Sequence, residues 1–259
     1  MFEFIEIEEN TLDIENGSYI NIDNDKIDSN KNYMFLKGSI PIGFYMANYF
    51  EDGFFNKDMI KILSKNIPTT QNRADISGKI DPDKMYKSYH KYLTKDTKYN
   101  KNNTRTIKNK DCKYSFSNNV KSKVINKDKR EYINNNEYID RTLKKLIKPI
   151  NKTTRQYFEI KEDNHIFGIW NELIINKGLR SAIHIDSLNK PDTLSCLVSL
   201  SLDNKLETSY LSLVDLDLVL PMKSNKSLLV FPLCNFRHAN NHINEDDLSG
   251  RVSLVFYVK

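Results

Sequence analysis

The chain has 259 residues, of which 39% are hydrophobic and 28% charged, so it is long enough for one large globular domain with its own core. No apolar run approaches the roughly 20 residues that cross a bilayer, so we expect no membrane partner. The net charge of +5 favours nucleic-acid binding, although abundant Asn, Lys and Ile can equally reflect an AT-rich genome. The acidic start predicts no signal peptide. Three scattered cysteines without C-x-x-C spacing predict a reducing, cytoplasmic or nuclear compartment.

The first 93 residues alternate between strand-like and helical patterns. Residues 2–8 and 32–38 have strand character, whereas 56–65 carries apolar residues at helical spacing after a polar cap. Residues 84–93 are compatible with a short helix. We therefore expect residues 1–93 to form an α/β support for the rest of the chain.

The middle of the chain divides into a polar insertion and a helical part. Residues 94–130 are low in aliphatic side chains and dense in Lys and Asn, which is typical of a solvated, mobile insertion. The alternative is a basic loop that grips a phosphate backbone. Residues 131–160 have helical apolar spacing, and we expect Pro149 to end or kink the helix predicted at 136–148.

The last part of the chain, residues 165–259, changes character. It consists of about eight short β-rich runs separated by turns, which is typical of a sandwich or jelly roll. Together with the preceding helices, this predicts an α+β fold: a double-stranded β-helix core (jelly roll, cupin-like) with N-terminal supporting helices. We expect a single domain over residues 1–259.

One H-x-D pair stands out in this β-rich part, within "LRSAIHIDSL". His184 and Asp186 are two residues apart, so on a strand both side chains reach one metal ion while Ile185 faces the opposite, apolar side. An H-x-D pair alone has little specificity. However, His238 and His242 follow downstream, and either can supply a third ligand. Two histidines and one carboxylate form the facial triad of non-haem Fe(II) oxygenases.

A second pair lies in the final strand-like run, "GRVSLVFYV". Arg251 and Ser253 are two residues apart and therefore on one face of a strand. Arginine grips a carboxylate in a bidentate manner, and a hydroxyl adds a further hydrogen bond. An iron triad with such an anchor is what 2-oxoglutarate requires, because its keto-acid end chelates iron and its far carboxylate needs a cation.

The order of H-x-D, distal His and R-x-S resembles the 2-oxoglutarate/Fe(II)-dependent dioxygenase superfamily. Within it, "WNELIINKGLRSAIHIDSLN", "LSCLVSLS", "SYLSLVDLDLVLPMKSNKSLLVFPLCNFRHA" and "SGRVSLVFYV" are most similar to the TET/JBP branch and its virus- and transposon-linked relatives. The resemblance covers residues 165–259. It departs from the branch where "KLETSYL" replaces a glycine pair and "SNKS" replaces a turn glycine.

The resemblance implies specific roles for residues of this chain. Fe(II) is held by His184, Asp186 and a distal histidine; His238 is preferred because it closely follows "LLVF" and precedes a small residue, and His242 is the alternative. The 2-oxoglutarate site contains four residues: Arg251, Ser253, Arg73 and Asn176. Asp75 lies near the substrate.

The function implied is hydroxylation of the methyl group of a 5-methylpyrimidine, either 5-methylcytosine or thymine, in nucleic acid, with DNA favoured. The insertion at 94–130 is then suited to hold the displaced backbone, because a paired base must leave the duplex to react. Two alternatives stay open. One is the same chemistry on a protein side chain or a free nucleotide, and the other is an inactive β-helix binding module. The sequence predicts no oligomeric state.

Overall fold

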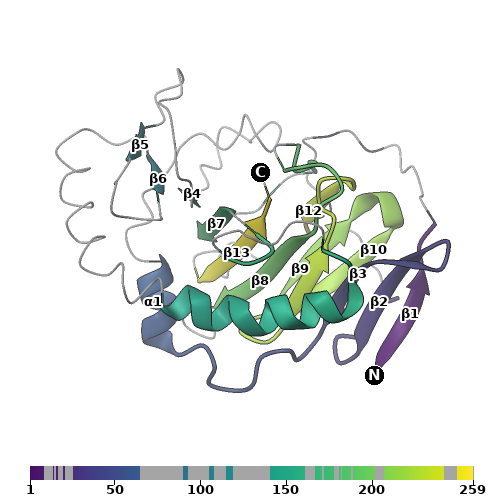
Figure 1. Ribbon diagram of the computed structural model, residues 1–259, viewed down its shortest axis with the longest axis horizontal. Coiled ribbons are helices and arrows are strands. Elements are labelled where there is room, and N and C mark those ends of the chain that lie inside the picture. The colour runs from purple at the N-terminus through teal and green to yellow at the C-terminus, as the bar shows by residue number, and fades with distance from the viewer. Residues whose placement is uncertain are drawn as a thin grey trace.

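The computed structural model describes residues 1–8, 14, 16, 20, 26–64, 90–92, 105–107, 115–118, 141–160, 167–170, 172–177, 181, 183–187, 189–201, 207–241 and 250–258. This part of the chain is rich in β-sheet and contains few helices (Figure 1). It agrees with a core of the sandwich or jelly-roll kind. No helix in the described ranges is long and apolar enough to cross a membrane.

The largest sheet joins strands from both ends of the chain. Its order is β1 (Phe2–Glu6), β2 (Asn32–Lys37), β3 (Ile40–Met46), β11 (Leu228–Phe231), β8 (Ser195–Ser201), β13 (Arg251–Tyr257) and β7 (Glu172–Lys177). The pair β1–β2 is parallel and the other five pairs are antiparallel. The N-terminal strands therefore continue the same sheet as the C-terminal ones. The division of the chain into a single domain with an insertion stays a prediction.

Two smaller antiparallel sheets complete the described strands. One has the order β10 (Leu218–Lys223), β9 (Thr208–Leu213) and β12 (His238–Asn240), with the 3-10 turn η1 (Val214–Leu216) between β9 and β10. The other has the order β4 (His90–Tyr92), β6 (Ser115–Asn118) and β5 (Arg105–Ile107). The short helix expected at 84–93 is wrong for residues 90–92, which form β4. Strands β5 and β6 lie within 94–130, whose other residues are outside the described part.

The seven-stranded sheet is buried on both faces. One face packs on the sheet β10–β9–β12, and their shared cluster includes Leu197, Leu229, Leu213 and Leu220. The hydroxyl of Tyr45 on β3 donates to the Pro221 carbonyl of β10 at 2.5 Å and so ties the two sheets together. Burial between the sheets raises the pKa of Tyr45 to about 12. The interior between the two sheets is where the candidate site lies.

A helix at 141–157 covers the opposite face of the seven-stranded sheet (Figure 1). Its buried residues Leu143, Leu146, Ile147 and Ile150 recur at helical spacing and pack on sheet residues such as Leu254. Of the two effects expected of Pro149, an end to the helix is wrong, because the helix continues to residue 157. Pro149 is exposed, and apolar residues on both sides of it remain buried. Burial of about 1.5–3 kcal/mol per side chain outweighs the roughly 3 kcal/mol that an interior proline costs.

The expectation of N-terminal supporting helices is not supported. In the described part of residues 1–93 the helical element is α1 (Lys57–Ser64), and the preceding segment contributes β1, β2 and β3 to the sheet. Strand β3 escaped prediction because Pro41 and Gly43 argue against a strand. Gly43 is needed there, since a Cβ would lie 2.5 Å from the Phe231 ring and 2.8 Å from the Val230 carbonyl oxygen of β11.

Candidate metal centre

The two histidines of the candidate site are joined through their backbones. His184 forms an isolated antiparallel bridge with His238 of β12. The amide of His184 donates to the His238 carbonyl at 3.0 Å, and the His238 amide donates back to the His184 carbonyl at 2.9 Å. This reciprocal pair places both side chains on the same face, because directly paired residues of a ladder point the same way. Residues 54 positions apart in sequence are therefore held next to each other.

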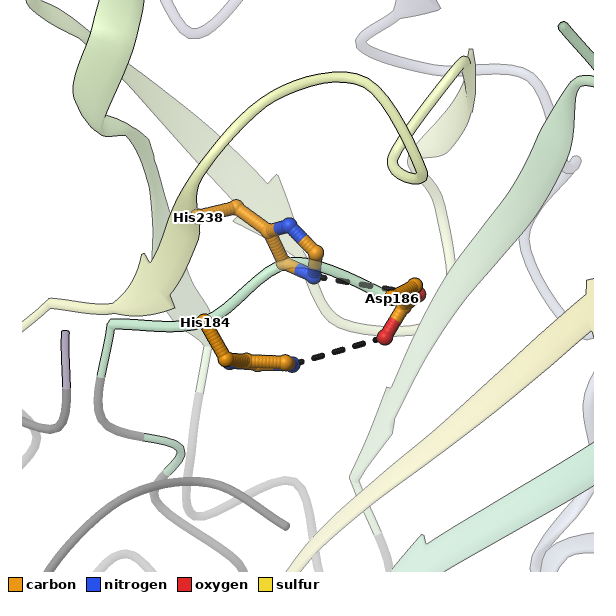
Figure 2. A group of neighbouring side chains, drawn as sticks. All are labelled: His184, Asp186 and His238. Carbon is orange, nitrogen blue, oxygen red and sulfur yellow. Dashed lines mark ion pairs between the residues drawn. The ribbon is translucent and has the colours of Figure 1, made fainter. Parts of the chain in front are cut away.

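Asp186 completes a cluster with the two imidazoles. Its backbone amide donates to the Leu233 carbonyl at 3.3 Å, which fixes the segment after the bridge. His184 Nε2 lies 3.5 Å from Asp186 Oδ1, and His238 Nε2 lies 3.8 Å from Asp186 Oδ2. Figure 2 shows both rings pointing at the carboxylate. The three ligand atoms all lie within 4.8 Å of one another.

The local backbone differs from the strand predicted for this segment. His184 is limited to a single bridge, and Ile185 and Asp186 lie outside any strand. The expectation that Ile185 faces an apolar side is wrong, because its side chain is 37% exposed. Ile183 is instead the buried residue and packs with Ala239. Asp186 reaches the histidines because the chain turns after the bridge, where Asn189 N donates to the Asp186 carbonyl at 3.0 Å.

A second hydrogen bond fixes the ring of His238. Its Nδ1 lies 3.0 Å from the carbonyl oxygen of Phe236, and only a protonated Nδ1 can donate to a carbonyl. The tautomer therefore leaves Nε2, the nitrogen nearest Asp186, with a lone pair. Metal-binding histidines commonly donate their second ring nitrogen to a backbone carbonyl in this way. His238 is thus prepared to act as a ligand.

Asn189 supports the carboxylate and was missed from the sequence. Its Nδ2 donates to Asp186 Oδ2 at 3.5 Å and to Ser195 Oγ at 3.2 Å, and the side chain is buried. The amide thus links the carboxylate to the start of β8. The only sequence signal is an Asn three residues after Asp186, which also fits an ordinary turn.

We expect Asn189→Ala to lower the affinity for divalent metal about 10–100-fold, as loss of an outer hydrogen-bond partner typically does. Without the Asn189 amide, the Asp186 carboxylate can rotate away from the imidazoles. Titration with Co(II) followed by its visible absorption measures this affinity. Asn235→Ala is the matched control, because Asn235 Nδ2 donates to the exposed Asp192 at 3.3 Å. Equal affinity in the Asn189 variant and wild type would contradict the assigned role.

An ion pair fixes the chain entering β12. Asp215 of η1 accepts hydrogen bonds from the backbone amide and from Nε of Arg237, both at 2.6 Å. The Arg237 carbonyl in turn accepts from the Val214 amide at 2.8 Å. Nη1 of Arg237 also donates to the Ile14 carbonyl at 2.6 Å, so the residue before His238 is held at four points. The two charged residues lie 22 positions apart, so their pairing leaves no local sequence pattern.

Arg251 and Ser253 face the interior between the two sheets. Val252 and Leu254 belong to the helix-covered cluster, so their neighbours on β13 point to the other face. Ser253 pairs in register with Ser199 of β8, and the Ser199 hydroxyl lies 3.1 Å from that of Ser209 on the opposing sheet. Arg251 is 4% exposed. The metal cluster and the arginine thus line one interior from opposite sheets.

Burial has a cost for the guanidinium. Desolvation lowers the pKa of Arg251 to about 10, which still leaves the group charged at neutral pH. A buried cation gains from an anion brought to it, and Arg is the side chain best suited to a carboxylate. Residues lining this interior therefore fit the far carboxylate of a keto acid. On the other side of β13, Ser253 pairs in register with Asn176 of β7.

The two nitrogen–oxygen pairs of the cluster also fit a transition-metal ion. Two atoms bound to one ion at about 2.1 Å lie no more than about 4.2 Å apart. Both nitrogen–oxygen separations, 3.5 and 3.8 Å, meet this limit. Two imidazoles with one carboxylate are the ligands of non-haem Fe(II) sites. His242, Arg73 and Asp75, which were also predicted for the site, lie outside the described residues.

Comparisons with known proteins give structural neighbours. No protein-family model matches the sequence, and no curated protein matches it. Among solved structures, "NgTET1 in complex with 5mC DNA" is similar with a TM-score of 0.46 and 15% identity, over 93% of this chain and 82% of that one. "The structure of OsALKBH1" gives a TM-score of 0.29 and 17% identity, over 47% and 64%.

Proposed function

We propose that this chain is an Fe(II)- and 2-oxoglutarate-dependent dioxygenase with a double-stranded β-helix core, and that it hydroxylates the methyl group of a 5-methylpyrimidine in nucleic acid. The observation that carries the proposal is the cluster of His184, Asp186 and His238 facing the same interior as the buried Arg251. The resemblance of residues 165–259 to the TET/JBP branch supports the choice of substrate.

The first group of residues would form the metal site. His184, Asp186 and His238 would hold Fe(II), with Asn189 and the Phe236 carbonyl orienting two of the ligands. When bound, Fe(II) and 2-oxoglutarate supply oxidising chemistry: decarboxylation of the keto acid to succinate and CO2 is coupled to insertion of one oxygen atom of O2 into a C–H bond.

The co-substrate site and the substrate site are assigned separately. Arg251 would neutralise the far carboxylate of 2-oxoglutarate and Ser253 would donate a hydrogen bond to it. Arg73 and Asn176 are proposed beside the same co-substrate, and Asp75 beside the substrate. The buried leucines between the sheets keep this interior dry, which strengthens the ionic contact with Arg251.

Two other functions make different demands. A hydroxylase of protein side chains or free nucleotides would share the site but would need no affinity for a nucleic-acid backbone. An inactive binding module would not require ligand atoms gathered within 4.8 Å or an oriented His238 ring. A net charge of +5 favours the nucleic-acid substrate over the first of these alternatives.

Mass spectrometry of nucleosides tests the proposal. The enzyme is incubated with Fe(II), 2-oxoglutarate and DNA that contains 5-methylcytosine, thymine or neither methylated base, and succinate is measured in parallel. We expect a hydroxymethylpyrimidine nucleoside together with succinate, and neither product from Asp186→Ala. Unchanged nucleosides with succinate formed only in the presence of a peptide would overturn the substrate, and absence of succinate with every substrate would overturn the enzyme.

A further inference from the structure

The exposed face of the helix at 141–157 carries a single sign of charge. Among its 17 positions there are six cations and no Asp or Glu. We call these residues, all of them exposed, the cationic stripe: Arg141, Lys144, Lys145, Lys148, Lys152 and Arg155. At 3.6 residues per turn they fall within an arc of about 100°, opposite the arc that packs on the sheet. The nearest described acid along the chain is the exposed Glu159.

The stripe is long and is anchored on the core. From its first to its last cation the helix rises about 21 Å. Over that length a DNA duplex presents about twelve phosphate charges. Buried Leu146 and Ile150 anchor the helix beneath the cations, and Thr153 contacts the Tyr49 hydroxyl at 3.2 Å. Neighbouring cations one turn apart repel each other, so a polyanion laid along the stripe relieves that repulsion.

The stripe and the metal cluster lie on different sides of the seven-stranded sheet. The helix packs on the face that carries Val252 and Leu254, whereas His238 is paired in register with Leu213, which belongs to the cluster between the two sheets on the other face. A phosphate bound at the stripe therefore does not lie at the metal cluster. Binding there requires neither metal nor co-substrate.

We propose that the cationic stripe is a second nucleic-acid surface that binds the phosphate backbone without reading sequence. A membrane-surface helix needs an exposed apolar face, and here the apolar residues are buried in the core. A protein interface has an apolar or aromatic centre. The exposed aromatic residue of this helix, Tyr157, stands at its end in contact with Phe2 and Phe44. Backbone phosphates match such a surface best.

The triple variant Lys145→Gln, Lys148→Gln, Lys152→Gln tests the stripe, because glutamine keeps helix propensity and removes charge. The matched control Lys26→Gln, Lys31→Gln, Lys226→Gln removes three lysines that are paired with Asp217, Glu3 and Asp52. Binding of a labelled 20-base-pair duplex is followed by fluorescence anisotropy between 50 and 200 mM salt. Circular dichroism and melting temperature verify folding, and Lys148→Gln with Lys152→Gln serves as a milder variant.

The plot of log affinity against log salt concentration has a negative slope, and we expect this slope to become less steep by about 0.9 for each phosphate that is no longer neutralised. The change is then up to about 2.7 in the triple variant and clearly less in the control. The decrease in affinity over this salt range then shrinks by up to about 40-fold. Equal effects in both variants, or unchanged binding, would overturn the proposal. So would lysine-dependent capture by phosphatidylserine vesicles with DNA binding intact. If Asp186→Ala retained DNA binding and wild type formed no nucleoside product, the proposed chemistry would be rejected, whereas the proposal for the cationic stripe would be retained.

Discussion

His238→Ala is expected to lower divalent-metal affinity, and with it turnover of 2-oxoglutarate, by more than about 100-fold. Loss of a residue that only supports a ligand costs up to about 100-fold, and loss of a ligand itself should cost more. The imidazole supplies one of three ligand atoms in the cluster, and its ring is already oriented by the Phe236 carbonyl. No neighbour on β12 can replace it, since Ala239 and Asn240 carry no ligand of this kind. Co(II) titration and succinate release measure the two quantities separately.

His242→Ala is the matched control for this prediction. The sequence left both histidines open as the distal ligand; the structure brings His238 to Asp186 and His184, whereas His242 lies outside the described residues. We expect His242→Ala to bind Co(II) and to form succinate close to wild type. If instead His242→Ala lost metal and His238→Ala kept it, the proposed ligand set would be wrong, although His184 and Asp186 could still be ligands.

Features of the fold that follow from local sequence pattern could be predicted, whereas those that depend on tertiary packing could not. The β-rich C-terminal part could be predicted from the sequence because its runs are short, rich in strand-forming residues and separated by turns. Pro149 misled because its helix penalty is local, whereas the packing that outweighs it comes from the sheet. Gly43 misled for the same reason, since the space it leaves is filled by Phe231 of a strand far along the chain.

The candidate site shows the same limit at the level of single residues. Spacing placed His184 and Asp186 together, but it assumed a strand where the chain makes one bridge and then turns. Ile185 consequently became exposed instead of buried. The supports were invisible in the sequence: Asn189 looks like any turn residue, and Asp215 finds Arg237 only because η1 and β12 are adjacent in space. Partners that orient a site are chosen by the fold, and they follow no fixed spacing.

Arg251→Met is expected to separate stability from function. Burial lowers the pKa of Arg251 from its ordinary value to about 10. Holding the charged form in the folded state at neutral pH therefore costs about 3 kcal/mol, taking 1.36 kcal/mol per unit. Methionine of similar length avoids this cost. We expect the free variant to unfold at the same or a higher denaturant concentration than wild type, by up to about 3 kcal/mol, while losing affinity for 2-oxoglutarate.

The sign of the pH dependence follows from the lowered pKa. Wild type bears the full cost below pH 10, where the folded guanidinium is charged, and recovers it as the pH rises from about 10 toward the ordinary pKa of arginine. The advantage of Arg251→Met is therefore complete at neutral pH and shrinks above pH 10. Urea unfolding at pH 7 and pH 10.5 measures the difference.

The co-substrate supplies the second half of the same test. At 100 times its dissociation constant a ligand stabilises the folded state by about 2.7 kcal/mol. We expect 2-oxoglutarate with Mn(II), without O2, to raise the melting temperature of wild type and to leave Arg251→Met nearly unchanged. Arg237→Met is the matched control, because it removes the side-chain partner of Asp215 but keeps the backbone bond, and it should cost roughly 1–3 kcal/mol. Loss of stability in Arg251→Met with an undiminished response to 2-oxoglutarate would show that the buried arginine serves the fold and does not bind the co-substrate.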